Sequence, residues 1–290
     1  MKKNTIKIAL LQQESDNTRE NNLKKALSWI KKAVAHDAKI VISTELFLHD
    51  YFCKKYDSSQ FDLAESVPGP TTEAFQEVAR QHKVVLTCSV FEKDGPLFYN
   101  TLAVIDADGS YLGKYRKMHI PDDPGFYEKY YFTPGDTGFK VFDTMYGRIG
   151  TLICWDQWFP EAARITAMQG ADLLIYPTAI ATLEHESGQD KQTFLNAWQT
   201  VQQSHAITNG CHVASVNRVG TEDGMKFWGS SFVAGPFGEM LTEGGNREQI
   251  VYADCNWEKN DEVRREWPFF RDRRVDAYSS LQKTWLSADE

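Results

Sequence analysis

The sequence predicts an α/β fold, because short apolar runs typical of buried strands alternate with segments whose apolar residues recur at helical spacing. Residues 6–12 (Ile-Lys-Ile-Ala-Leu-Leu-Gln) are typical of a strand that enters a core. Residues 19–35 then predict a helix with one buried stripe, and residues 39–42 a second buried strand. A strand, a helix and a strand at this spacing predict a right-handed βαβ unit.

The alternation of strand and helix patterns continues along the chain. Turns at Pro68-Gly69-Pro70 and at residues 106–109 separate some of the segments. The later helices are expected from residue 71, over residues 160–169 and over about 193–209. The later strands are expected over residues 84–90, 99–105, 110–115, 147–154, 171–177, 211–217, 229–236 and 249–254.

The chain shows no break that would divide it into separate domains. It has 290 residues, 42% of them hydrophobic, which is enough for a large core. It contains no Pro/Gly/Ser-rich linker, repeat or low-complexity tract. We therefore expect one domain over residues 1–290, in which about 256–290 form a C-terminal tail. Five aromatic residues from residue 264 onward suggest that this tail docks on a partner subunit: Trp267, Phe269, Phe270, Tyr278 and Trp285.

Composition excludes several classes of partner. The net charge of −8 argues against nucleic acid and anionic membranes, and weakly favours a cationic small substrate. No run reaches the ~18 apolar residues of a membrane span, and the first residues do not resemble a signal peptide. The five cysteines are scattered without CxxC or zinc-site spacing. We expect free thiols in a cytoplasmic protein, with no metal.

Glu45 lies in Ser-Thr-Glu-Leu-Phe, directly after the second predicted strand. Ligands of α/β sheets tend to bind outside the carboxyl ends of the strands, which favours a functional role. From position alone, a surface or helix-capping glutamate is equally open. Its apolar neighbours, however, make a structural role costly.

Cys154 lies where the apolar run of residues 147–154 gives way to a predicted helix. Pro160 suits the first turn of that helix, because its missing N–H costs little there. Backbone N–H groups at such a turn can stabilise a thiolate and later an oxyanion. The alternative is a buried, inert cysteine, which is the commoner situation for a free thiol.

Lys117 follows the strand expected over residues 110–115. A lysine in isolation is usually solvated, since lysine is rarely buried unpaired. The aromatic-rich segment that follows, residues 122–132, contains Glu128 and favours a pocket wall or lid. A second polar loop, residues 178–191, carries Glu184 and Glu186.

The segments around Glu45, Lys117 and Cys154 resemble, in this order, the three motif blocks of the nitrilase (carbon–nitrogen hydrolase) superfamily. The resemblance extends from the first strand to about residue 255. It implies a four-layer α-β-β-α sandwich, with two sheets face to face and helices outside. It also implies a homo-oligomer, whose interface we expect to include the helix after Cys154 and the C-terminal tail.

The resemblance further implies a cysteine-dependent amidohydrolase. Cys154 would be the nucleophile, because a thiolate attacks carbonyls well, and Glu45 would be the general base. Lys117 would stabilise the developing oxyanion, with the backbone N–H of Trp155 as second donor. Glu128 would position Lys117 or the substrate. No metal or organic cofactor is expected.

The expected substrate is a small ureido compound that carries a positive charge. Residues 178–190 contain no arginine, and an ammonium group would need a carboxylate or an aromatic face at its end. Glu184 is the predicted carboxylate, with Glu186 as second choice. Three alternatives stay open: a branch of the same family that acts on an acid, a non-catalytic protein that uses the fold as a scaffold, and a cysteine protease in which a histidine pairs with Cys154.

Overall fold

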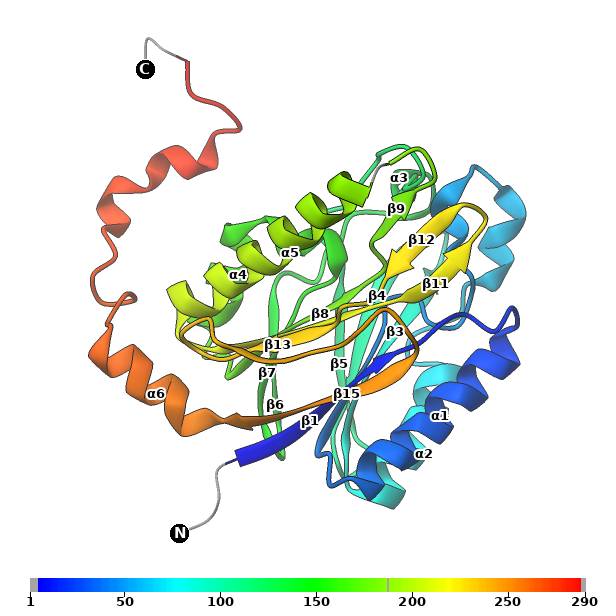
Figure 1. The fold of residues 1–290 in the computed structure, drawn as a ribbon, viewed down its shortest axis with the longest axis horizontal. Coiled ribbons are helices and arrows are strands. Elements are labelled where there is room, and N and C mark those ends of the chain that lie inside the picture. The colour runs from blue at the N-terminus through cyan, green and yellow to red at the C-terminus, as the bar shows by residue number, and fades with distance from the viewer. Residues whose placement is uncertain (1–4, 187, 288–290) are drawn as a thin grey trace.

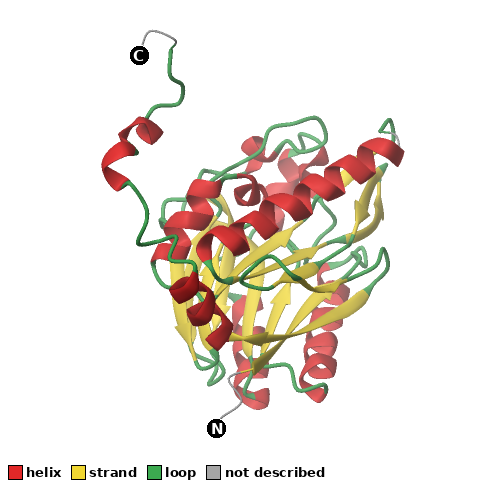
Figure 2. Cartoon of the chain, turned by 60° about the vertical axis from the view of Figure 1, so that its left-hand side comes forward, coloured by secondary structure: helices red, strands yellow, loops and turns green. Residues whose placement is uncertain are grey.

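Two six-stranded sheets pack face to face, with helices on both outer faces (Figures 1 and 2). The computed structural model describes residues 5–186 and 188–287. The arrangement of helix, sheet, sheet and helix layers confirms the predicted four-layer sandwich. Within the described ranges no helix is long and apolar enough to cross a membrane.

The first sheet contains the predicted βαβ unit. Strands β1 (Thr5–Gln12) and β2 (Ile40–Ser43) are parallel, with Ile8 opposite Ile40, and α1 (Arg19–Ala35) connects them. Helices α1 and α2 (Pro70–His82) lie on the outer face of this sheet (Figure 1). In spatial order its strands are β15 (Gln249–Asn256), β1 (Thr5–Gln12), β2 (Ile40–Ser43), β3 (Val85–Asp94), β4 (Leu97–Ile105) and β5 (Tyr111–Arg116).

The second sheet carries α4 (Pro160–Met168) and α5 (Gly188–Asn209) on its outer face (Figure 2). In spatial order its strands are β14 (Met240–Glu243), β13 (Phe232–Ala234), β10 (His212–Asn217), β8 (Leu173–Thr178), β7 (Gly147–Thr151) and β6 (Lys140–Thr144). A small third sheet consists of β11 (Val219–Glu222), β12 (Met225–Trp228) and β9 (Ala181–Leu183).

Strand β1 explains why the central strands of the sheets carry continuous apolar runs rather than an alternating pattern. Its Ile8 and Leu10 belong to the large core cluster that also holds side chains of the second sheet. Its Ala9 and Leu11 belong to a separate cluster beneath α1 and α2. Both faces of the strand are therefore buried, as in other α/β sheets.

Strands β11, β12 and β14 were not predicted, and three segments near the predicted site differ from the prediction. Strand β7 ends at Thr151, and a short 3₁₀ helix (Cys154–Trp158) separates it from α4. The loop expected over residues 178–191 contains β9, and α5 begins at Gly188 rather than near residue 193. The aromatic segment contains a single helical turn, α3 (Glu128–Tyr131).

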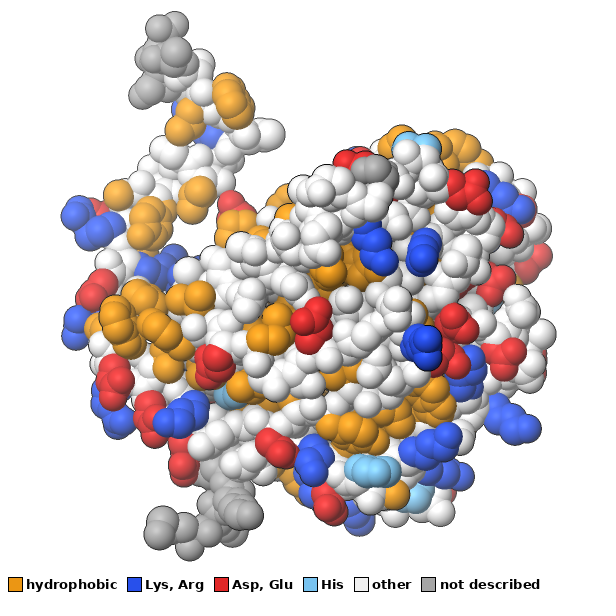
Figure 3. Space-filling model, viewed as in Figure 1, with side chains coloured by type: hydrophobic (Ala, Val, Ile, Leu, Met, Phe, Trp, Pro, Cys, Tyr) orange, Lys and Arg blue, Asp and Glu red, His pale blue; other side chains and the backbone are white. Residues whose placement is uncertain are grey.

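The C-terminal segment leaves the body of the molecule after α6 (Trp257–Glu266) (Figure 1). Two short 3₁₀ helices follow, Val275–Ala277 and Ser279–Gln282. Hydrophobic side chains are exposed along this tail (Figure 3), and Trp285 is 86% exposed.

Candidate active site

Lys117 lies buried between two glutamates. Its Nζ is 2.9 Å from Glu45 Oε1 and 2.6 Å from Glu128 Oε2. Glu45 and Lys117 come shortly after β2 and β5, and Glu128 opens α3. Strands β2 and β5 point in the same direction, because β5 is antiparallel to β4, β4 to β3, and β3 is parallel to β2. Their carboxyl ends thus bring the two residues together, and the solvated alternative for Lys117 is wrong.

Hydrogen bonds from two further side chains hold the glutamates. Asn100 Nδ2 donates to Glu45 Oε1 at 2.7 Å, and the Tyr51 hydroxyl donates to Glu128 Oε1 at 2.8 Å. Glu45 Oε2 is buried and has no hydrogen-bond partner among the described residues. An acceptor left free in a dry site is suited to take a proton from an incoming group.

Cys154 lies at the start of the 3₁₀ helix with a φ angle of +42°. This left-handed backbone is uncommon for residues other than glycine, and such strain is found at functional sites. The side chain is only 6% exposed and borders a cavity. A hydrogen bond from the Ala179 backbone, at the end of β8, reaches its sulfur.

The four ionisable groups influence one another. Burial raises the pKa of the Cys154 thiol, and Glu45 adds to this rise while Lys117 opposes it. Burial opposes the charge of Lys117, but Glu128 and Glu45 outweigh it and raise the pKa of this lysine. Burial raises the pKa of Glu128 to about 7. The lysine therefore stays protonated, and the thiol needs an adjacent base to become a nucleophile.

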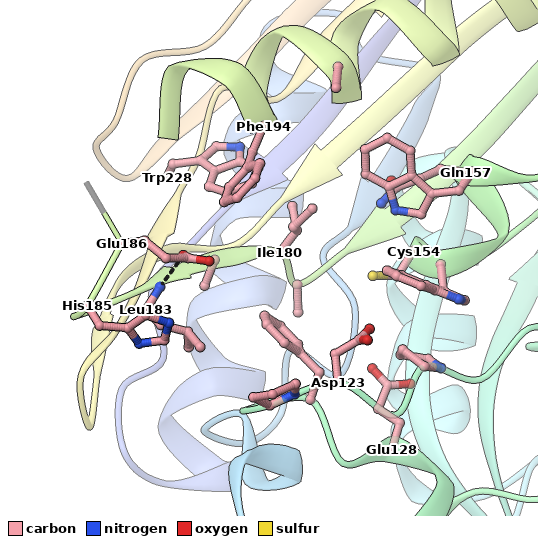
Figure 4. Close-up of a pocket in the computed structure, with 18 residues that line it drawn as sticks. Asp123, Glu128, Cys154, Gln157, Ile180, Leu183, His185, Glu186, Phe194 and Trp228 are labelled. Carbon is pink, nitrogen blue, oxygen red and sulfur yellow. Dashed lines mark hydrogen bonds between the residues drawn. The ribbon is translucent and has the colours of Figure 1, made fainter. Parts of the chain in front are cut away.

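The cavity beside Cys154 has a volume of about 470 Å³ (Figure 4). Glu128 lies near Cys154, whereas Phe194, Glu186 and Trp228 lie further along the pocket. No lysine or arginine occurs among the described residues that line it. These are Pro121, Asp123, Pro124, Phe126, Glu128, Cys154, Trp155, Gln157, Trp158, Ala179, Ile180, Ala181, Leu183, His185, Glu186, Phe194, Ala197 and Trp228.

The structure separates Glu184 from this cavity. Trp155 and Glu186 line it, but Glu184 borders a neighbouring depression with Lys54 and Asp223. The tight turn after β9 causes this separation: Glu186 Oε2 accepts a hydrogen bond from the Leu183 N–H at 2.7 Å (Figure 4). Glu184 therefore does not line this cavity, whereas Glu186, the second choice, and Asp123 do.

Tyr51, Asn100 and Asp123 are not among the residues predicted from the sequence. The sequence contains a signal for Asn100, because an amide side chain within a buried strand needs a hydrogen-bond partner. The sequence contains no such signal for Tyr51 and Asp123, since they lie in irregular segments next to other polar and aromatic residues.

Comparisons with known proteins identify the family to which the chain belongs. The family model described as "Carbon-nitrogen hydrolase" matches residues 7–265. The chain belongs to the carbon–nitrogen hydrolase family. This enzyme is 42% identical to a protein of Francisella tularensis named citrullinase, over 97% of this chain and 99% of that protein. It is also 42% identical to a tomato (Solanum lycopersicum) protein named N-carbamoylputrescine amidase, over 97% and 96%.

A solved structure has nearly the same fold. The carbon–nitrogen hydrolase of Helicobacter pylori G27 superposes with a TM-score of 0.94 at 43% sequence identity, covering 97% of this chain and 100% of that one. The family membership makes this carbon–nitrogen hydrolase an amidohydrolase that acts on small amide-type substrates.

Proposed function

We propose that this carbon–nitrogen hydrolase converts N-carbamoylputrescine to putrescine, carbon dioxide and ammonia, a step of polyamine biosynthesis. The observation that carries the proposal is the charge of the pocket. Asp123 and Glu186 line it, and its described lining contains neither lysine nor arginine. A substrate that ends in an ammonium group finds a carboxylate there, whereas one that ends in a carboxylate finds no cation.

The first half of the reaction uses the buried ionic cluster. Glu45 takes the proton of the Cys154 thiol, and the sulfur attacks the ureido carbon. Lys117 Nζ and the Trp155 N–H donate to the oxygen on which negative charge develops; losing one such donor typically costs about 10²–10³ in rate. Glu45 then returns its proton to the leaving nitrogen, and the carbon–nitrogen bond breaks.

The second half releases the enzyme. Glu45 removes a proton from a water molecule, which attacks the thioester-like carbon bound to Cys154. The carbon–sulfur bond breaks, and the thiol regains its proton. The carbamic acid that leaves loses carbon dioxide to give an amine or ammonia. The three products are the same whichever nitrogen leaves first.

The far part of the pocket suits the chain of four methylenes and its ammonium group. Ile180, Leu183 and Phe194 offer apolar walls. Glu186, Phe194 and Trp228 all line this pocket, so it offers a carboxylate and two aromatic rings to an ammonium group (Figure 4). One oxygen of Glu186 accepts the Leu183 N–H, which fixes the orientation of the carboxylate.

Citrulline is the second candidate substrate. It differs from N-carbamoylputrescine by one carboxylate, on the carbon that bears the amine. Trp158 and Trp228 line the pocket, and their indole N–H groups have no partner among the described residues. These groups favour an acceptor on the substrate. We prefer N-carbamoylputrescine, because the extra carboxylate would lie among acidic side chains without a cation.

The test compares ammonia release from N-carbamoylputrescine, L-citrulline and N-carbamoyl-β-alanine, with Cys154→Ala as the control. We expect kcat/KM to be at least about tenfold higher for N-carbamoylputrescine, since a mismatched buried charge costs more than 1.4 kcal/mol. A preference for citrulline would overturn the proposal in favour of the second candidate. A preference for N-carbamoyl-β-alanine would place the enzyme with β-ureidopropionase-like or ω-amidase-like relatives that act on acids.

A further inference from the structure

Asp156 is a fully buried carboxylate close to the nucleophile, and the reaction described above does not use it. Its Oδ2 accepts hydrogen bonds from the Tyr115 hydroxyl at 2.7 Å and from the Ile153 N–H at 2.9 Å. Its Oδ1 accepts from the His119 N–H at 3.1 Å and from His119 Nδ1 at 2.7 Å. Both oxygens thus have two donors, which is a saturated site for a carboxylate.

The donors come from the two backbone segments that carry Lys117 and Cys154. Tyr115 lies near the carboxyl end of β5, and His119 lies two residues after Lys117. Asp156 therefore accepts hydrogen bonds from residues on both sides of the lysine. The Tyr115 hydroxyl also accepts the Met118 N–H at 3.3 Å. Ile153 directly precedes Cys154, so the same carboxylate also fixes the turn of the nucleophile.

These two segments belong to different sheets. Strand β5 lies at one edge of the first sheet, and β7, which leads to Cys154, lies in the second. A contact between them decides how far the lysine lies from the sulfur. The His119 ring also stacks on Phe159, with the centroids 3.7 Å apart and 7° between the planes, so packing restrains the histidine as well.

We propose that Asp156 is a positioning residue that sets the distance between Lys117 and Cys154. The role is geometric, because the hydrogen-bond partners of the carboxylate are Tyr115, His119 and Ile153, and Asp156 is not among the described residues that line the cavity. Catalytic groups act within narrow limits, and a displacement of about 1 Å can cost about 10²-fold in rate. Asparagine has the shape of aspartate, but its amide N–H₂ would face two of the four donors, so Asp156→Asn loosens the contact without removing side-chain volume.

The experiment measures two properties of full-length Asp156→Asn. The first is alkylation of Cys154 by iodoacetamide as a function of pH, with Cys154→Ala reporting reaction at the other four cysteines, all of them buried. Glu45, Lys117 and Glu128 are the charged groups that act on this thiol. If Lys117 moves away, the pH midpoint of alkylation should rise by about one unit or more. The second is turnover of N-carbamoylputrescine, where we expect kcat to fall about 10- to 100-fold with KM within about threefold.

Asp172→Asn is the matched control. Asp172 precedes β8 at the end opposite the pocket, and its Oδ2 accepts the Arg148 N–H at 2.8 Å. It should lower thermal stability without moving the alkylation midpoint. If Asp156→Asn does not fold, Tyr115→Phe removes one donor and should raise the midpoint by a smaller amount.

An unchanged alkylation midpoint in the folded variant would overturn the proposal, because a purely structural aspartate would lower only stability. The turnover measurement rests on the proposed function, but the alkylation measurement needs no substrate. Failure of the substrate assignment alone would therefore leave the alkylation shift intact.

Discussion

At the scale of single residues, the charge of the pocket is carried by few side chains, and Glu186 is the one that we expect to bind the ammonium group. Glu186→Gln keeps the shape and the acceptor for the Leu183 N–H but removes the negative charge. A hydrogen bond to a charged group is worth about 1.5–3 kcal/mol. KM for N-carbamoylputrescine should therefore rise about 10- to 100-fold in steady-state assays, with kcat changed less.

Glu184→Gln is the control for this substitution. It removes the same charge two positions earlier, from a side chain that borders the neighbouring depression. It should change KM by less than about threefold, which is the size expected for an exposed charge. Equal effects of the two substitutions would mean that the ammonium group lies elsewhere, and Asp123→Asn would be the next variant.

Glu128 gives a second prediction, on the pH dependence of stability. Burial raises the pKa of its carboxyl from the ordinary value of 4.5 to about 7. Between these two values the folded chain holds a proton that the unfolded chain has lost, so the contribution of Glu128 to stability falls as pH rises. Urea unfolding at pH 5, 6, 7 and 8 should show that Glu128→Gln flattens this decline. Parallel curves for the two proteins would show that Glu128 does not titrate in this window.

The positions of the principal candidate residues in the fold were predictable because each follows a recognisable strand. Glu45, Lys117 and Cys154 lie at strand ends, where local sequence patterns place them without knowledge of the fold. The pairs Tyr51–Glu128 and Asn100–Glu45 were not predictable, since they join residues 77 and 55 positions apart. Such contacts depend on how the strands are ordered in the sheet, which no short segment encodes.

At the scale of elements, the turn between β7 and α4 stores strain at one residue. Cys154 has a φ angle of +42°, which glycine adopts easily and alanine does not. We expect Cys154→Gly to be at least as stable as Cys154→Ala in denaturant unfolding. In ordinary helix or strand positions glycine would instead be about 0.5–1 kcal/mol less stable than alanine. That ordinary difference, if measured here, would show that the turn is not strained.

The elements that the sequence did not reveal are those held by distant partners. Helix α4 begins at Pro160 and ends shortly before Gly170, so both of its ends were predictable. Strand β9 has only three residues, and it exists because it pairs with β12 about forty residues later. Without that pairing in view, the position of Glu186 relative to Glu184 could not be derived.

At the scale of the whole molecule, the sandwich brings together residues that belong to different sheets. The ends of β2 and β5 supply Glu45 and Lys117, and the second sheet supplies Cys154. Strands that run in parallel place their carboxyl ends at the same edge, so the site is a consequence of topology.

The C-terminal tail gives the last prediction, since it buries little of its own apolar surface. Val275, Leu281 and Trp285 are 66%, 66% and 86% exposed, on a segment that projects from the body (Figure 1). Apolar surface gathered on one segment favours association, and we propose that a second copy of the chain covers it. Light scattering after gel filtration should show an oligomer for the full chain and a smaller species for Leu281→Asp/Trp285→Asp. Met145, 57% exposed in the turn between β6 and β7, supplies the control: Met145→Asp should leave the mass unchanged. A full chain that elutes as a monomer would contradict the proposal, and the exposed tail would then need a different partner.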